Sequence, residues 1–270
     1  MLFEIVSIFP GFFAGIFDHG IVRRARADGL LTVNVHDLRA FTRDRHRTVD
    51  DRPFGGGEGM VLKPEPLAEA LASLGLAPKA QRQPSDGTRV ILLSAQGRPF
   101  TQPVARELAA LDRIVLLCGR YEGVDERINE LYCDAELSIG DYVLSGGELA
   151  AAVVMDAVMR LLPGVLGNEA SGEFESFGVA DTEIATGQEG VPRSQHGAGG
   201  LLDYPHYTRP AEFHGLTAPT VLLKGDHQQI RRWRREQQLR KTLANRPDLL
   251  ERADLSDDDR ELLFSLGWQR

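Results

Sequence analysis

Three glycine-bearing segments carry the residue types of a ligand pocket: LLSAQGRPF at 92–100, LLCGRYEGVDER at 116–127 and SIGDYVLSGGEL at 138–149. We name them the first, second and third glycine segments. A phosphate-binding loop would add a Gly-Lys-Ser/Thr ending and a helix amino terminus aimed at the anion, and none of the three has this ending. The residue types therefore indicate a pocket that holds a flat, mainly uncharged ligand through backbone amides and carbonyls.

The elements around these segments alternate between strand-like and helix-like patterns. Short apolar runs rich in β-formers occur at 3–9, 30–38, 89–94, 112–119 and 133–140. Helix-like segments occur at 64–74, 101–110, 124–131 and 147–161. Alternation of this kind predicts an α/β fold with a mostly parallel sheet. In such sheets the ligand crevice lies beyond the carboxyl ends of the strands, where the three glycine segments would converge.

Composition changes after the last of these helices, which Pro163 and Gly164 end. Residues 169–200 are rich in Gly, Ser, Glu and Gln and predict a partly mobile linker. Helical patterns return at 224–243 and 256–266. We therefore expect three parts, which are a ligand-binding domain over 1–168, the linker over 169–200 and a small helical domain over 201–270.

The overall composition is typical of a globular protein, with 42% hydrophobic and 26% charged residues among 270. No apolar run approaches the ~18 residues of a membrane span, and no signal peptide is recognisable, so we expect a cytoplasmic protein. The two cysteines, Cys118 and Cys133, fit neither a redox pair nor a zinc site. We expect both to be reduced core residues.

Charge is unevenly distributed along the chain. The net charge of −8 argues against a polyanionic partner, but positive charge is concentrated at 43–52 and 231–241. Acidic residues gather instead at 169–189 and 248–261. Basic runs usually form a solvated helix face, so charge alone does not establish nucleic-acid binding.

Several longer blocks together resemble one family, the bacterial tRNA (guanine-N1)-methyltransferases of the SPOUT class, called TrmD. They span nearly the whole chain, except roughly residues 178–200 and the extreme tail. Their length and order make a chance match negligible. The blocks are LFEIVSIFP at the start, RHRTVDDRPFGGGEGM at 45–60, LSAQGR, LCGRYEGVDER, SIGDYVLSGGELA, MDAVMRLLPGVLGNEAS at 155–171, LLDYPHYTRP at 201–210 and IRRWRREQQL.

The resemblance implies an α/β fold of the SPOUT type, a parallel sheet with a deep trefoil knot, plus a small helical C-terminal domain. Most folds are not knotted, so pattern analysis alone does not predict the knot. Members of the family use S-adenosylmethionine, form homodimers with composite active sites, and methylate N1 of guanosine 37 in the anticodon stem-loop of tRNA. A loosely bound Mg²⁺ is also implied, whereas no metal site caged by protein residues is expected.

Matching positions assign the cofactor to thirteen residues of the three glycine segments. Apolar and aromatic side chains among them suit the adenine ring, and backbone groups suit its edge. Glu122 could contact the cofactor's amino group, or could instead cap the helix that follows it. The thirteen residues are Leu93, Ser94, Gly119, Tyr121, Glu122, Gly123, Ser138, Ile139, Gly140, Tyr142, Leu144, Gly146 and Gly147.

Guanine N1 carries a proton that must leave before this nitrogen can attack a methyl group, so the reaction needs a general base. The family's aspartate has its counterpart at Glu175, whose carboxylate is on an arm one methylene longer. Glu173 and Asp181 are the substitutes, and Glu175 could also be an ordinary acidic linker residue. Arg160 matches the arginine that stabilises charge on guanine O6, although a solvated helix end would explain it too.

The same resemblance assigns RNA contacts to both basic clusters. Phe54 and Glu58 depart from the family, which has tyrosine at the first position and a small residue or proline at the second. Methylation on the Watson–Crick edge requires an extruded guanine. Arg43 and Arg47 belong to the first cluster, and Arg231, Arg232, Arg234 and Arg235 of the second could neutralise phosphates. The expected RNA-binding residues are Arg45, His46, Arg52, Gly59, Asp203, His206, Tyr207, Thr208, Arg209, Arg231 and Arg232.

Two alternatives stay open from the sequence. A tRNA-binding protein could keep the fold and lack the chemistry, because a glutamate replaces the family's aspartate and the linker is enlarged. An active enzyme could also act on a different guanine.

Overall fold

The fold is described from a computed structural model, which covers residues 1–83, 86–167, 174–178 and 197–268. The chain forms two compact units, Met1–Gly167 and Asn168–Arg270. Each unit has its own hydrophobic core, and each is described by itself.

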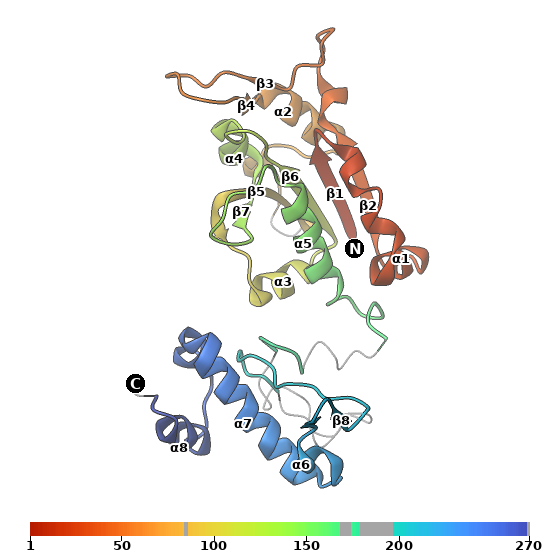
Figure 1. The fold of residues 1–270 in the computed structure, drawn as a ribbon. Coiled ribbons are helices and arrows are strands. Elements are labelled where there is room, and N and C mark those ends of the chain that lie inside the picture. The colour runs from red at the N-terminus through yellow and green to blue at the C-terminus, as the bar shows by residue number, and fades with distance from the viewer. Residues whose placement is uncertain (84–85, 168–173, 179–196, 269–270) are drawn as a thin grey trace. The chain divides into compact units, whose positions relative to one another are not determined.

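A five-stranded parallel sheet forms the centre of the first unit (Figure 1). Its strand order is β2-β1-β6-β5-β7, and every neighbouring pair is parallel. All five apolar runs of the sequence become these strands, so the prediction of an α/β fold with a parallel sheet is confirmed. The strands are β1 (Leu2–Ser7), β2 (Thr32–Asp37), β5 (Thr88–Pro99), β6 (Arg113–Cys118) and β7 (Ala135–Ser138).

Both faces of the sheet are buried, because successive strand residues point to opposite sides. Ile114 and Leu116 of β6 pack with α1 (Gly20–Ala27), α3 (Gln102–Ala109) and α5 (Glu148–Met159) on one face. Val115 and Leu117 pack with α2 (Pro64–Ser73) and α4 (Glu126–Tyr132) on the other. The near-continuous apolar strands follow from this two-sided burial.

The direction in which the chain crosses the sheet reverses around β5. From β5 the chain moves to β6 on one side, and from β6 it returns past β5 to β7 on the other side. The chain does not leave the sheet at Ser94, as the first glycine segment had suggested. Instead β5 continues to Pro99, with a register shift between Leu93 and Arg98. Gly97 lets β5 pass close to β7, because any other residue would place a Cβ 2.5 Å from the backbone nitrogen of Leu137.

A small hairpin extends from the first unit. Strands β3 (Asp50–Asp51) and β4 (Val61–Leu62) pair antiparallel and carry between them the glycine-rich stretch with Phe54, whose side chain is exposed. The hairpin is hydrogen-bonded to the second glycine segment. The Glu122 amide donates to the Met60 carbonyl at 3.0 Å, and the Asp125 amide donates to the Leu62 carbonyl at 3.0 Å.

The second unit is helical around a core of five buried leucines, Leu201, Leu239, Leu250, Leu255 and Leu263. Its helices are α6 (Thr220–Leu223), α7 (His227–Asn245) and α8 (Asp257–Ser265), and a hairpin pairs β8 (Glu212–Phe213) with β9 (Leu216–Thr217). The Asp226 side chain caps α7 by accepting from two backbone amides, which starts the helix three residues later than the sequence pattern suggested.

The predicted helices are present, and each bound lies within three residues of its expected position. The four-residue helix α6 is an addition, and so is α1. It has only eight residues and begins with Gly20, so its helical signal is weak. Val22 and Ala25 bury one face of it. Among the described residues, no helix is both long and apolar enough to cross a membrane.

Candidate functional site

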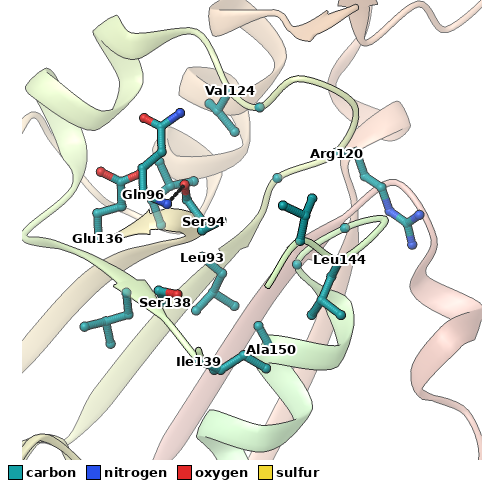
Figure 2. Close-up of a pocket in the computed structure, with 18 of the residues that line it drawn as sticks. Leu93, Ser94, Gln96, Arg120, Val124, Glu136, Ser138, Ile139, Leu144 and Ala150 are labelled. Carbon is teal, nitrogen blue, oxygen red and sulfur yellow. Dashed lines mark hydrogen bonds between the residues drawn. The ribbon is translucent and has the colours of Figure 1, made fainter. Parts of the chain in front are cut away.

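A pocket of about 420 Å³ lies beyond the carboxyl ends of β6 and β7 and beside residues 92–96 in the middle of β5 (Figure 2). The three glycine segments form its walls. All thirteen residues that the sequence assigned to the cofactor line this single pocket: Leu93, Ser94, Gly119, Tyr121, Glu122, Gly123, Ser138, Ile139, Gly140, Tyr142, Leu144, Gly146 and Gly147. The structure therefore brings these residues together, while the ligand they hold stays a prediction.

The pocket has an apolar side and a polar side. Leu93, Ile139, Leu144 and Ala150 gather in the lower part of Figure 2. Gln96 and Glu136 lie together in the upper part. Two of the three serines of the lining are fixed locally: Ser94 Oγ accepts from the Gln96 backbone amide at 3.0 Å, and Ser138 Oγ donates to the Gly140 carbonyl at 3.0 Å. A flat ring with polar atoms at its edge suits this arrangement.

The charges in the lining favour a cation over a phosphate. Three carboxylates, those of Glu122, Glu126 and Glu136, belong to it. The arginine of the lining, Arg120, is paired with buried Glu148 at 2.8 Å, so its charge is neutralised inside the protein. The missing lysine of the third glycine segment is consistent with this charge balance.

Close approaches by neighbouring atoms explain the paired glycines of the third segment. A Cβ on Gly146 would overlap the Arg120 side chain, and a Cβ on Gly147 would lie 2.7 Å from Cys118 Cα. Gly140 has φ +153 and lies against the Tyr142 ring. A side chain at Gly140 would have both an unfavourable positive φ and a clash with the Tyr142 ring, so this position requires glycine.

Tyr121 and Glu122 stand at the exposed part of the second segment. Tyr121 has φ +60, an uncommon conformation for a non-glycine residue and a mark of local strain. The suggestion that Glu122 caps the following helix is wrong, because Asp125 caps α4 by accepting from the Arg127 amide. The Glu122 side chain instead packs on Gly59, whose added Cβ would lie 2.6 Å from Glu122 Cγ.

The two proposed catalytic residues belong to different units. Arg160 is half-buried at the carboxyl end of α5, and its backbone amide donates to the Asp156 carbonyl. Glu175 is half-buried in the short stretch 174–178. That stretch is tied to the second unit, because Phe177 donates to the Leu201 carbonyl at 2.8 Å. The substitute bases Glu173 and Asp181 lie outside the described residues.

Similarity to known proteins identifies the family of this chain. The family model described as "tRNA (Guanine-1)-methyltransferase TrmD" matches residues 1–252. The chain belongs to this family. Curated relatives named "tRNA (guanine-N(1)-)-methyltransferase" include proteins of Koribacter versatilis (56% identical over 98% of both chains), Geobacter metallireducens (47% over 98% of both) and Heliobacterium modesticaldum (49% over 97% of this chain and 89% of the relative).

With the family known, the first basic cluster can be placed on the hairpin side of the first unit. Arg45, His46, Arg52 and Gly59 are exposed, and their contact with RNA stays a prediction. Asp44 organises the turn before them by accepting from the His46 and Thr48 amides and the Thr48 hydroxyl. These bonds, chiefly that from the Thr48 side chain, lower the pKa of Asp44. Arg43 pairs with Glu69 at 2.7 Å, and its side chain stays largely exposed.

The second cluster lies on α7 and on the chain before it. His206, Tyr207, Thr208, Arg209 and Arg232 are exposed, while Asp203 and Arg231 are half-buried. Asp203 is held in place through its carboxylate, which accepts from the Tyr204 amide at 2.7 Å and pairs with His206 at 2.9 Å.

Two arginines of the second cluster make contacts with other residues of the second unit. Arg235 is joined to Asp259 by two bonds of 3.0 and 2.7 Å, and both side chains are largely buried. Arg235 is therefore a structural residue and not a free cation for phosphates. Arg234 lies over the Tyr204 ring at 4.7 Å, and burial raises the pKa of that tyrosine.

Sequence reasoning missed several lining residues, among them Gln96, Arg120, Glu126 and Glu136, together with Glu148 beside the pocket. Each lies within or next to a glycine segment, but nothing in one sequence shows that Arg120 and Glu148 are partners. The two cysteines are buried and free, as predicted. Burial raises the pKa of Cys118 and raises that of Cys133 to about 12, so both stay thiols at neutral pH. Within the described part of the chain, no cluster of His, Cys, Asp or Glu could hold a metal ion.

Proposed function

We propose that this protein transfers a methyl group from S-adenosylmethionine to N1 of guanosine 37 in tRNA. The proposal rests on family membership over residues 1–252 and on the single pocket that all thirteen cofactor candidates line. The relatives' names specify guanine N1 of tRNA. The methyl donor and the position next to the anticodon are the finer parts of the proposal.

The pocket residues fit the donor. Leu93, Ile139 and Leu144 offer an apolar surface for an adenine ring, and the backbone of the glycine segments offers donors and acceptors for its edge. The carboxylates of the lining suit a cationic sulfonium and an amino group, neither of which a phosphate cradle would favour. When bound, S-adenosylmethionine would supply an electrophilic methyl group.

The chain's own residues would prepare the guanine. Glu175 would accept the N1 proton, which frees the nitrogen lone pair for attack. The negative charge that then spreads toward guanine O6 would be stabilised by the fixed positive charge of Arg160. Glutamate is one methylene longer than the family's aspartate, and a misplacement of about 1 Å can cost on the order of 100-fold in rate. The backbone around 174–178 must therefore hold the carboxylate further back.

The active form would be a homodimer with composite sites, built on a trefoil-knotted SPOUT domain over residues 1–168. Exposed apolar side chains of the first unit support a second copy: Val143 is 87% exposed, Leu149 49% and Val153 46%. Residues 169–200 would act as a linker to a tRNA-binding domain over 201–270. A loosely bound Mg²⁺ and a cytoplasmic location belong to the same proposal.

Calorimetric titration with S-adenosylmethionine, followed by methyl transfer to tRNA transcripts carrying G or A at position 37, separates the proposal from its alternatives. The proposal predicts cofactor binding and turnover of the G37 transcript alone. Binding without turnover on either transcript would support a tRNA-binding protein that has lost its chemistry. Turnover that ignores the base at position 37 would point to a different target guanine.

The role of Glu175 has its own test. Glu175→Gln keeps size and polarity but cannot accept the N1 proton, so methyl transfer should fall by at least ~100-fold while cofactor affinity stays close to that of the natural protein. Glu126→Gln, which removes a carboxylate from the pocket lining, is the matched control and should change affinity for the cationic ligand more than it changes turnover. Full activity of Glu175→Gln would exclude Glu175 as the base.

A further inference from the structure

Arg120 connects three parts of the first unit through its guanidinium group. Its Nε and one terminal nitrogen contact Glu148 Oε2 at 2.9 and 2.8 Å. Its other terminal nitrogen donates to the Ser145 carbonyl at 3.0 Å. The same guanidinium lies over the Phe9 ring at 4.6 Å. One side chain therefore contacts the start of α5, the third glycine segment and the chain that follows β1.

The Glu148 carboxylate is fully enclosed, with a side chain only 1% exposed. Its second oxygen accepts from the Ser7 hydroxyl at 2.6 Å, so both oxygens have partners. A buried carboxylate is costly unless it is paired and hydrogen-bonded. Loss of Arg120 would leave this charge uncompensated, and the elements around it would have to rearrange.

Backbone contacts join the same two glycine segments. Arg120 forms an isolated antiparallel bridge with Gly146, and the Gly147 amide donates to the Gly119 carbonyl at 2.9 Å. The absent Cβ of Gly146 leaves the space that the Arg120 side chain occupies. The glycine pair of the third segment and the arginine of the second are thus complementary features of one junction.

We propose that Arg120 and Glu148 are positioning residues that lock the second glycine segment to the third and so set the width of the cofactor pocket. The proposal rests on the proposed function only for the identity of the ligand. In Figure 2 the Arg120 guanidinium lies away from the apolar group formed by Leu93, Ile139 and Ala150. Arg120 belongs to the pocket lining, but its three guanidinium nitrogens are already bonded to Glu148 and the Ser145 carbonyl. Its effect on a ligand would therefore pass through the backbone of the two segments.

A purely structural ion pair would lower stability without changing the pocket, and the chain offers a matched control for that case. Arg113 pairs with Glu4 at 3.2 Å, and the two side chains are 22% and 6% exposed, against 17% and 1% for Arg120 and Glu148. Arg113 begins β6, at the end of the strand opposite to the pocket. Arg113→Lys and Arg120→Lys therefore weaken similar pairs at different places.

The first test needs no ligand. Hydrogen exchange on the full chain should show the 138–149 peptides exchanging about tenfold or more faster in Arg120→Lys than in the natural protein, because the single nitrogen of lysine cannot reproduce the contacts that three guanidinium nitrogens make with Glu148 and Ser145. Arg113→Lys should leave these peptides unchanged. Equal exchange of 138–149 in Arg120→Lys and the natural protein would overturn the proposal.

The second test is calorimetric titration with S-adenosylmethionine. Loss of the outer groups that orient metal ligands costs about 10–100-fold in affinity, and we expect a loss of about tenfold or more in Arg120→Lys, with Arg113→Lys unchanged. An unchanged dissociation constant in Arg120→Lys would also overturn the proposal. If the natural protein does not bind this ligand, the proposed function fails, and the exchange experiment still decides whether the lock exists.

A second variant covers the case in which Arg120→Lys does not fold. Glu148→Gln keeps the shape of the side chain and an oxygen that can accept from Arg120, but removes the charge. We expect faster exchange of the 138–149 peptides and weaker binding of S-adenosylmethionine, as in Arg120→Lys, but both changes should be smaller. In Arg120→Lys/Glu148→Gln the two effects should be less than additive, because both changes break one interaction. Additive effects on exchange would contradict a shared lock.

Discussion

Gly147→Ala tests the close approach between the third glycine segment and the end of β6. The backbone at Gly147 has φ −76 and ψ −7, which alanine adopts freely, so the substitution introduces no backbone strain. Its added Cβ would lie 2.7 Å from Cys118 Cα and 3.1 Å from the Gly119 nitrogen. Carbon atoms ordinarily pack at about 3.5–4.0 Å, so the two backbone segments must separate by about 1 Å.

The magnitude follows from this displacement. Overpacking of a close-packed site costs about 1–3 kcal/mol. For a cooperative unit of this size, a loss of about 2 kcal/mol lowers the melting temperature by about 4–8 °C. The same shift would open the pocket between Gly147 and Gly119, whose hydrogen bond is 2.9 Å long. A misplacement of about 1 Å can cost ~100-fold in rate, so the rate of methyl transfer should fall by about this factor although the protein stays folded.

Thermal unfolding and single-turnover methyl transfer measure the two effects. Gly119→Ala is the control for stability, because its Cβ would meet Leu93 O at 3.5 Å and Val124 Cγ2 at 3.6 Å, which are ordinary contacts. It should melt within about 2 °C of the natural protein. A Gly147→Ala protein with the natural melting temperature and natural turnover would refute the argument from backbone crowding.

Three further predictions concern other parts of the chain. Gly59→Ala places a Cβ against Glu122 at φ +80, and methyl transfer assays should show a loss of about tenfold or more with a folded circular dichroism spectrum. Asp259→Asn should destabilise the second unit by about 3 kcal/mol at pH 7. Burial raises the pKa of Asp259, but the bonds and charge of Arg235 outweigh it and lower the pKa overall, so this difference should shrink in melts as pH falls below the ordinary value of 3.8. Arg232→Ala should reduce the slope of log K against log salt for tRNA binding by about 0.7–0.9.

The five strands and the main helices could be predicted because their signals are local. The apolar runs of β1 and β6 are buried on both faces, which makes them stand out in a single sequence. Helix α1 gave no comparable signal, because it is short, starts with glycine and carries three arginines. The continuation of β5 past Ser94 depends on how closely Gly97 passes Leu137, a contact that no local pattern encodes.

The candidate pocket was predictable for a related reason. Two of its walls are glycine-bearing stretches at the ends of β6 and β7, and a parallel sheet brings such ends to one edge. The third wall is the part of β5 just after its pairing with β6 ends at Leu93. The partners behind the walls were not predictable. Ser7 and Glu148 are 141 residues apart in sequence, and Arg120 is 28 residues from Glu148, so only the folded chain shows that they form one network. The same holds for Arg235, whose sequence context suggests a phosphate contact and whose structural partner is Asp259.

The most direct test of the central claim is nucleoside mass spectrometry of tRNA transcripts after incubation with the protein and S-adenosylmethionine. The account predicts 1-methylguanosine that maps to position 37 of the G37 transcript, and no methylated nucleoside in the matching A37 transcript. Methylation at another guanine, or no methylated nucleoside although the protein binds both ligands, would contradict it.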